Sequence, residues 1–317
     1  MEMAGCKMQM MLALCCFIML ATLPPIHGWG TDGHSIICKI AQSRLSDAAA
    51  DSVNELLPKW AEDDLGSVCS WADQVRFRYR WSSPLHFINT PEICSYKYTN
   101  EDGEAGRCVA GAINNYTSQL LTSNSASNKA QYNLTESLLF LSHFMGDIHQ
   151  ACSRIPKSDE NSKFHYRKKK GITLMSITFQ PLHVGFAADK GGNTIDVHWY
   201  RRKAVLHHVW DTDIIETAEK RFYDSNVDSL VDAIQQNITS EWADEVKRWE
   251  TCGLNKTACP DQYASEGIKA ACDWAYKGVQ QESVLEDDYF LSRLPIVHRR
   301  LAQGGVRLAA TLNRIFG

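Results

Sequence analysis

The chain has 317 residues, of which 44% are hydrophobic, so it is long enough for one large domain or two small ones with a sizeable core. Its formal net charge is −4, which excludes a strongly basic surface that binds nucleic acid mainly by neutralising phosphates. If nucleic acid is the substrate, a metal ion must carry much of the phosphate recognition.

The first 28 residues have the pattern of a secretory signal peptide. Lys7 precedes the apolar run 8–23, and a Pro-Pro break leads to the small residue Gly28. An uncleaved membrane anchor is the alternative, but sixteen apolar residues are short for a membrane span. We therefore expect a signal peptide at 1–28, a mature domain at 29–317, no membrane association, and a secreted or vacuolar protein.

The sequons and cysteines also indicate a protein of the secretory pathway. Asn-x-Thr sequons predict surface glycosylation at Asn115, Asn133, Asn237 and Asn255. Eight of the eleven cysteines follow the signal, and none is in Cys-x-x-Cys zinc spacing. We expect them to form structural disulfides, as an oxidising compartment permits.

Apolar residues at helical spacing predict a mostly α-helical single domain. The predicted helices span 35–44, 48–57, 111–119, 135–146, 214–218, 227–247, 264–276 and 294–315. Ser46 with Asp47 is an expected N-cap of the second, and Thr135 of the fourth. Residues 83–89 read as an extended segment, and strand signals are few.

Seven of the eleven histidines lie between His143 and His208. Two pairs share the form His-x-x-x-Asp: His143 with Asp147, and His207 with Asp211. Residues four apart lie on one helix face, so each pair can direct an imidazole and a carboxylate at one point, as a zinc site needs. One such pair is a weak signal, and two are a strong one.

Other candidates are weaker when taken singly. If the signal is cut after Gly28, the amine and carbonyl of Trp29 can chelate a metal together with the nearby His34, although Trp29 taken alone is more typical of a core residue. Asp73 follows Trp71 on a predicted helix, where a carboxylate is costly unless it is paired. His86 alone is more typical of a structural histidine.

Taken together, these residues resemble the secreted, zinc-dependent, single-strand-preferring nucleases of plants and fungi, including the plant bifunctional nucleases, which share the zinc phospholipase C fold. The resemblance covers essentially all of the mature chain. Its motifs are Trp29-Gly-x-x-Gly-His34, Trp71-Ala-Asp73, Pro84-Leu-His86-Phe, His143-Phe-x-Gly-Asp147, Pro181-Leu-His183, Gly191-Gly-Asn193 and His207-His-x-Trp-Asp211.

The resemblance implies three zinc ions. The first is implied to be held by Asp73, His86, His143 and Asp147. The second is implied to be held by the Trp29 amine and carbonyl, His34 and the bridging Asp147. The third is implied to be held by His183, His207 and Asp211. The remaining histidines are then structural or support the ligands.

The resemblance also implies the reaction: hydrolysis of RNA and single-stranded DNA to 5′-phosphorylated products, with 3′-nucleotidase activity and no protein nucleophile. Asp73 is expected to orient the attacking water, and Arg76 to contact the phosphate. Phe87 is expected to stack on the base, Asn89 to hydrogen-bond its edge, and Asn193 to line the pocket. Stacking tolerates every base and suits unpaired strands.

Residues 151–180 depart from the family pattern, which runs His-Gln-Pro-Leu-His without interruption. They carry a net charge of +5 and end in Thr-Phe-Gln, which a pyrimidine-rich tract ending in CAG would encode. We interpret them as a translated retained intron or a gene-model error, with a genuine surface loop as the rival. If Gln150 and Pro181 still meet, the site survives; if not, the third zinc is lost.

The cysteine pattern also departs from the family. The resemblance implies the bridges Cys38–Cys69, Cys94–Cys272 and Cys252–Cys259. Plant relatives usually carry an Arg-Asp-Cys where this chain has 98–103, so the usual partner of Cys108 is missing from the sequence. Loss of a native disulfide typically costs about 2–5 kcal/mol, so we expect an effect on stability and not on chemistry.

Two other functions remain open at this point. A zinc phosphodiesterase for lipid head groups could use the same fold, although Phe87 and Asn89 argue against it. A secreted glycoprotein disabled by residues 151–180 would hold fewer than three zinc ions. A monomer is the default expectation.

Overall fold

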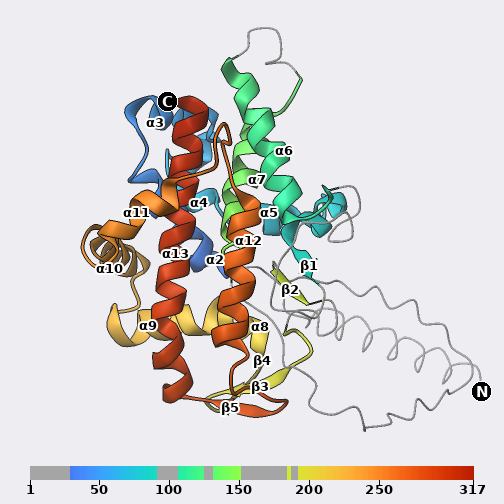
Figure 1. Cartoon of the computed structure of the whole chain (residues 1–317), viewed down its shortest axis with the longest axis vertical. Helices are drawn as coiled ribbons and strands as arrows, with labels where there is room; N and C mark the ends of the chain where they lie inside the picture. Colours follow the sequence, from blue (N-terminus) through green and yellow to red (C-terminus); the bar gives the residue numbers. More distant parts are fainter. Residues whose placement is uncertain (1–28, 91–105, 125–130, 151–183, 187–191) are drawn as a thin grey trace, which may run out of the picture.

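A computed structural model describes residues 29–90, 106–124, 131–150, 184–186 and 192–317. Helices dominate the architecture (Figure 1), as the sequence predicts. The predicted signal peptide and residues 151–180 lie outside the described residues, as does Cys94. Within the described ranges, no helix combines the length and apolar character that crossing a membrane requires.

Helix α13 (Asp287–Phe316) runs the length of the molecule and packs against α2 (Thr31–Gln42). Gly304 and Gly305 allow the two helices to approach closely. A Cβ at Gly305 would lie 2.5 Å from Ile40 Cγ2, and one at Gly304 would lie 3.1 Å from Ile37 Cδ1. Each of these buried isoleucines contributes about 1.5–3 kcal/mol through burial. The helix that carries His34 is therefore fixed against the longest helix of the fold.

Helix α7 (Leu134–Asp147) packs against α6 (Val109–Leu121) and is buried on almost every side from Ser137 onward. Aromatic rings join the two helices. Tyr116 stacks on Phe140 with a centroid distance of 5.0 Å, and Phe140 stacks on Phe144 at 5.5 Å. Because this packing fixes α7, the polar residues near its end sit in a dry and rigid setting.

The remaining helices connect α2, α6, α7 and α13 and pack around them. Before α6 these are α3 (Asp47–Leu56), η1 (Lys59–Ala61), α4 (Leu65–Val68), α5 (Trp71–Val75) and η2 (Arg80–His86), and η4 (Thr122–Asn124) follows α6. The later ones are α8 (Leu206–His208), the π-helix η5 (Val209–Asp213), α9 (Ile214–Phe222), α10 (Val227–Thr239), α11 (Ala243–Glu250), α12 (Pro260–Ala270) and the π-helix η6 (Ala271–Ala275).

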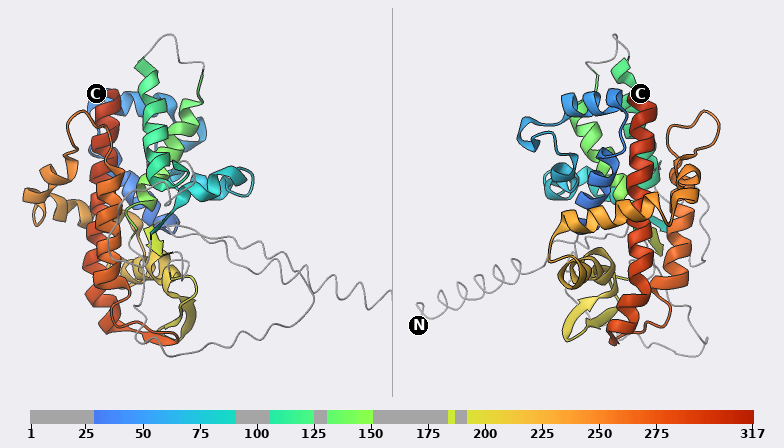
Figure 2. Two further views of the ribbon diagram at one scale, coloured as in Figure 1. Left: turned by 45° about the vertical axis from the view of Figure 1, so that its right-hand side comes forward. Right: turned by 90° about the vertical axis from the view of Figure 1, so that its left-hand side faces the viewer.

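Two small sheets complete the described fold. Strands β1 (Ile88–Thr90) and β2 (Val184–Phe186) pair in parallel, with Ile88 opposite Val184. Strand β3 (Asp196–Trp199) is antiparallel to β4 (Arg202–Val205) and parallel to β5 (Ser283–Leu285). Figure 2 shows this second sheet at the end of α13 that lies away from the C-terminus.

Each predicted helical range overlaps a helix, but three local predictions are wrong. Asn133, not Thr135, is the N-cap of α7, and its side chain accepts a hydrogen bond from the Glu136 N–H at 3.2 Å. The range 227–247 is two helices, because the chain turns at 240–242 between α10 and α11. The range 83–89 is not wholly extended, because η2 continues to His86 before β1 begins. Ser46 caps α3 as predicted.

Two of the three implied disulfides are formed by described residues: Cys38–Cys69 and Cys252–Cys259. Cys272 is also disulfide-bonded, while its implied partner Cys94 lies outside the described residues. Cys108 is buried at the start of α6. The Cys38–Cys69 bond ties α2 to the segment that leads into α5, and this connection matters for the site.

Candidate metal centre

The end of α7 carries His143 and Asp147, which face the same point as their spacing predicts. His143 Nε2 lies 3.2 Å from Asp147 Oδ2, and both side chains are fully buried. The apolar rings of α6 and α7 exclude water from this end of the helix, which makes the carboxylate and imidazole costly to bury without a compensating partner.

Two more predicted residues converge there from other elements. His86, at the end of η2, has its Nδ1 3.1 Å from Asp147 Oδ2 and 3.1 Å from His143 Nε2. Asp73 of α5 lies 3.6 Å from His86 Nδ1 and 3.8 Å from His143 Nε2. Arg76 follows one turn later, with its Nη1 3.4 Å from Asp73 Oδ1. The four implied ligands of the first zinc thus form one cluster.

His34 of α2 reaches the same carboxylate from the opposite side. Its Nε2 lies 3.3 Å from Asp147 Oδ1, and its ring stacks on His143 with a centroid distance of 4.0 Å. Gly146 makes this possible, because a Cβ at that position would lie 2.6 Å from His34 Nδ1. Asp147 therefore has one oxygen facing His34 and the other facing His86 and His143, as a bridging ligand would.

Two backbone carbonyls accept hydrogen bonds from rings in or beside this cluster. His143 Nδ1 donates to the Cys69 carbonyl at 2.8 Å, so Nε2 is the ring nitrogen that faces Asp147. The indole Nε1 of Trp29 donates to the Gly146 carbonyl at 3.0 Å. The sequence gives no signal for either contact, because the partners are 74 and 117 residues apart.

The second His-x-x-x-Asp pair is also assembled. His207 Nε2 lies 2.6 Å from Asp211 Oδ2, and both side chains are almost fully buried. The Gly30 N–H donates to the Asp211 carbonyl at 2.8 Å. Since the Trp29 indole also contacts the Gly146 carbonyl, the Trp29-Gly30 dipeptide connects the two pairs.

The pKa values of the three imidazoles differ, because burial and the nearby carboxylates act on them in opposite directions. Burial, then the charge of His143, lowers the pKa of His34 to about 4. Burial likewise lowers the pKa of His86 to about 4. Burial opposes the charged form of His143 too, but Asp147 and Asp73 outweigh it and raise its pKa to about 9. At neutral pH the first two imidazoles therefore present lone pairs, while the carboxylates attract a cation.

Asp211 has a pKa raised well above its ordinary value. Burial is the largest cause, followed by the charges of Asp73 and Asp147. The carboxylates of Asp73, Asp147 and Asp211 therefore lie close enough to repel one another. A divalent cation would relieve this repulsion, because it favours the ionised form of each acid.

The donor set fits a metal. Two groups of three buried side chains have ligand atoms within 4.8 Å of one another: His34 with His143 and Asp147, and Asp73 with His86 and His143. His34 Nδ1 and Asp211 Oδ1 are buried and have no hydrogen-bond partner among the described residues. Imidazole nitrogens and carboxylate oxygens in such a set suit zinc.

The structure describes the remaining predicted site residues only in part. His183 and the side chain of Asn89 lie outside the described residues, but β2 begins one residue after His183 and pairs with β1 beside Asn89. Phe87 is half-buried directly after His86, and Asn193 is half-buried in the turn before β3. Of the four predicted glycosylation sites, Asn115, Asn133 and Asn255 are exposed, and Asn237 is partly exposed.

The other described histidines have different surroundings. His198 lies 3.8 Å from Glu282, His208 lies 3.6 Å from Asp213, and burial lowers the pKa of His298 to about 4. His149 belongs to a separate network with arginines of α13. His165 lies outside the described residues.

Comparison with known proteins agrees with this geometry. The profile of the S1/P1 nuclease family matches residues 29–152 and 173–317. It passes over residues 153–172, which lie within the predicted insertion. The chain is 62% identical over 304 residues to Endonuclease 2 of Arabidopsis thaliana, covering 94% of each chain. It is 49% identical over 296 residues to Endonuclease 4 of the same plant, covering 91% of this chain and 89% of the relative.

A fungal relative extends the similarity. Nuclease S1 of Aspergillus oryzae is 29% identical over 315 residues, covering 93% of this chain and 94% of the relative. The two described disulfides fit a family of secreted proteins. With a profile that spans most of the residues and relatives matched along nearly their full length, the chain belongs to the S1/P1 nuclease family, and it is a nuclease that hydrolyses nucleic acids.

Proposed function

We propose that the chain is a zinc-dependent endonuclease that hydrolyses phosphodiester bonds of RNA and single-stranded DNA to 5′-phosphorylated products. We also propose 3′-nucleotidase activity, because a terminal 3′-phosphate can occupy the same site. The observation that carries the proposal is the buried convergence of His34, His86 and His143 on the carboxylate of Asp147, with Asp73 beside them. Such a set of groups is costly to bury unless a metal ion satisfies it.

Three zinc sites are proposed from these residues. Asp73, His86, His143 and Asp147 would hold one, and Trp29, His34 and Asp147 a second. His183, His207 and Asp211 would hold the third. When bound, zinc supplies a Lewis acid that polarises the phosphate and makes water nucleophilic near neutral pH.

The side chains around the metal have defined tasks. Asp73 accepts a hydrogen bond from the attacking water and turns it toward phosphorus. Arg76 holds Asp73 at 3.4 Å, and 17% of its side chain is exposed, so it can also donate to a phosphate oxygen of the substrate. The buried His143 and Asp147 stay fixed, since α7 cannot move without breaking its aromatic packing.

Single-strand preference follows from the base site that we place at Phe87, Asn89 and Asn193. Phe87 directly follows the implied ligand His86 in the chain, so a base stacked on it stays within reach of the cluster. Stacking requires an unpaired base and tolerates all four, while Asn89 and Asn193 would add hydrogen bonds to the base edge.

We further propose that residues 1–28 are a cleaved signal peptide and that the protein is a glycosylated, monomeric enzyme that is secreted or vacuolar. Cleavage before Trp29 would free the amine required at the second zinc site. The exposure of Asn115, Asn133 and Asn255 supports their glycosylation.

The test is zinc content and cleavage of single-stranded DNA by the purified mature protein. We expect three zinc ions per chain, loss of activity after chelation and recovery when zinc alone is restored. Asp147→Asn should lower cleavage by roughly 100-fold or more, because it weakens the shared ligand. Full activity after exhaustive chelation would refute the metal mechanism.

A further inference from the structure

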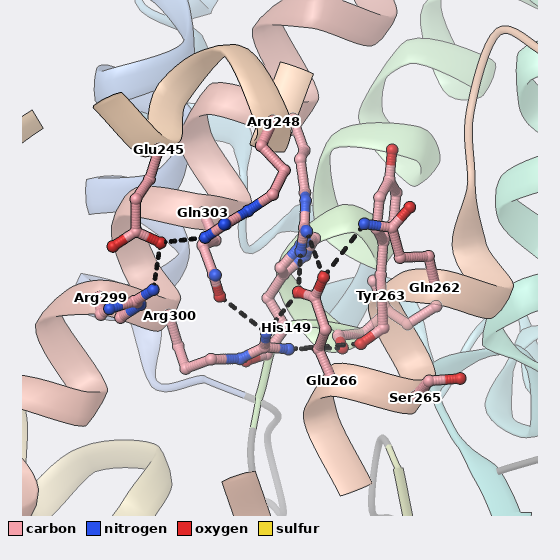
Figure 3. A network of polar contacts seen from close by, with 12 residues as sticks. His149, Glu245, Arg248, Gln262, Tyr263, Ser265, Glu266, Arg299, Arg300 and Gln303 are labelled. Atoms are coloured by element: carbon pink, nitrogen blue, oxygen red, sulfur yellow. Dashed lines mark hydrogen bonds and ion pairs between the residues drawn. The ribbon is translucent and has the colours of Figure 1, made fainter. Parts of the chain in front are cut away.

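A second polar network contacts the C-terminal end of α7. It consists of His149, Glu266 of α12, and Arg300 and Arg307 of α13, and we call it the α7 anchor. His149, Arg300 and Arg307 are all buried, with exposures of 0%, 3% and 0%. Figure 3 shows Arg300, Glu266 and His149 pointing toward one another, with Tyr263 and Gln303 beside them. Two buried arginines are costly, so their contacts require an explanation.

Arg300 binds backbone oxygens that follow Asp147. Its Nε donates to the His149 carbonyl at 2.8 Å, and its Nη2 lies 3.5 Å from the Ile148 carbonyl. These carbonyls lie just beyond the last residue of α7, where the helix supplies no further N–H to bond them. Arg300 satisfies these groups from within the protein, because its own side chain is only 4% exposed.

Arg307 fixes the ring of His149. Its Nη1 donates to His149 Nε2 at 3.0 Å, and since a guanidinium can only donate, Nε2 must accept. His149 Nδ1 therefore carries the hydrogen, which it donates to the Met145 carbonyl at 2.7 Å. The histidine thus bridges α13 and the last turn of α7, and only the neutral ring with this tautomer can make both contacts.

Glu266 balances the charge of both arginines. Its Oε2 lies 2.7 Å from Arg307 Nη1 and 3.4 Å from Arg300 Nη1. Arg307 Nη2 also donates to Glu266 Oε1 at 2.8 Å. The two guanidiniums and one carboxylate leave a net positive charge at the C-terminal end of α7, where the helix dipole favours it.

The held carbonyls belong to Met145, Ile148 and His149, and Asp147 lies among them in the chain. The carboxylate of Asp147 has contacts of 3.1 Å with His86, 3.2 Å with His143 and 3.3 Å with His34. A displacement of about 1 Å at this turn would disturb all three, and an error of that size is enough to impair a site. The indole of Trp29 holds the Gly146 carbonyl from the other side.

We propose that Arg300 and Arg307, balanced by Glu266, are positioning residues that fix the last turn of α7 and thereby set the geometry of the metal ligand Asp147. The inference rests on the proposed zinc-dependent function and deepens it. Among the described residues, the anchor's hydrogen bonds to the end of α7 reach the carbonyls of Met145, Ile148 and His149, so it acts through the backbone. Its last backbone contact at this end of α7 is with the His149 carbonyl, two residues after Asp147.

The test compares Arg300→Met with Arg314→Met, an arginine of the same helix. Arg314 donates to the carbonyls of Thr257 at 2.8 Å and Glu250 at 2.9 Å, and therefore serves an end of α11 instead of α7. The readouts are the zinc dissociation constant by chelator competition, the absorption spectrum of the cobalt-substituted protein, thermal stability, and kcat and KM on single-stranded DNA.

We expect Arg300→Met to weaken zinc binding by roughly 10–100-fold, to alter the cobalt spectrum and to lower kcat more than it changes KM. Arg300→Lys should recover part of the loss, because one amine can still reach a carbonyl. Arg314→Met should lower thermal stability without changing zinc affinity. If Arg300→Met does not fold, Glu266→Gln provides the same comparison with both guanidiniums in place.

Wild-type zinc affinity and kcat in a folded Arg300→Met or Glu266→Gln protein would overturn the positioning role and leave the nuclease proposal standing. The positioning role would also be overturned if Arg314→Met weakened zinc binding as much as Arg300→Met, since the effect would then be general destabilisation. A wild-type protein that neither binds zinc nor cleaves DNA would instead overturn the proposed function, and the positioning role with it.

Discussion

His143 donates a hydrogen bond from Nδ1 to the carbonyl oxygen of Cys69, at 2.8 Å. Cys69 is itself bonded to Cys38, one turn after His34 on α2. The disulfide thus links α2, which supplies His34, to the segment whose carbonyl orients His143 on α7. Its removal should affect both the fold and the metal site.

The first prediction concerns this disulfide. Replacing both Cys38 and Cys69 by serine should lower the free energy of unfolding by about 3 kcal/mol, the value typical for a loop of a few tens of residues. Zinc affinity should fall as well, because the Cys69 carbonyl loses its restraint. Urea unfolding and chelator competition measure the two effects. Replacing Cys252 and Cys259, which are seven residues apart, should leave zinc affinity unchanged; an equal loss in both variants would contradict the prediction.

A second prediction concerns Gly146. In Gly146→Ala the new Cβ would lie 2.6 Å from His34 Nδ1, so His34 must move away from Asp147. We expect destabilisation of about 1–3 kcal/mol and the loss of one zinc ion per chain, measured by denaturation and by elemental analysis. Gly253→Ala is the control, because its nearest neighbour would be Lys256 Cδ at 3.8 Å. Full zinc content in Gly146→Ala would show that His34 is not a ligand.

The third prediction tests the base site. Phe87→Ala should lower kcat/KM on single-stranded DNA by roughly 5–150-fold, since stacking on an aromatic side chain contributes about 1–3 kcal/mol per base. Zinc content should stay unchanged. Phe77, which is 79% exposed, provides the matched control, and Phe77→Ala should behave like the wild type. If the two variants cleave DNA equally well, Phe87 does not stack on the substrate.

The insertion gives a fourth prediction. Strand β2 pairs with β1 in the chain that contains residues 151–180, and the α7 anchor holds the chain up to His149. Loop length alone adds little entropic cost, because closure entropy grows logarithmically. We therefore expect the same zinc content and activity with and without residues 151–180. Three zinc ions only in the shortened protein would mean that the insertion breaks the third site.

The last prediction concerns pH and Glu219. Burial, then the charges of Asp32 and Glu216, raises the pKa of Glu219 from 4.5 to about 7, although Lys220 opposes this. The folded state therefore keeps a proton that the unfolded chain releases above pH 4.5. Stability from this group is present below that pH and is lost as the pH rises to about 7.

Glu219→Gln removes this dependence, because glutamine remains neutral. Relative to the wild type, the variant should gain roughly 1–3 kcal/mol between about pH 4.5 and 8. Urea midpoints of both proteins at about pH 5 and about pH 8 measure the gain, and metal-linked effects cancel in the comparison. A difference that is constant with pH would show that Glu219 is already ionised in the folded protein.

Local sequence patterns predicted the helices well where apolar spacing was regular, as at 48–57 and 135–146. They failed where tertiary contacts decide the outcome. The range 227–247 has helical spacing throughout, yet the chain turns at 240–242, and Trp242 and Trp249 are both buried there. Thr135 has a capping side chain, but it donates to the Leu56 carbonyl at 2.8 Å instead.

The sequence by itself determined which imidazoles and carboxylates pair at the ends of two helical segments, because residues four apart must share a helix face wherever the helix lies. It also determined that the fold is mostly α-helical, since apolar periodicity is a local property of the chain. Only the tertiary structure decided how the cluster is held. The contacts from Cys69 to His143, from Trp29 to Gly146 and from Arg300 to His149 join residues 74, 117 and 151 positions apart. Such pairs leave no periodic signal, because their distance is set by the packing of whole helices.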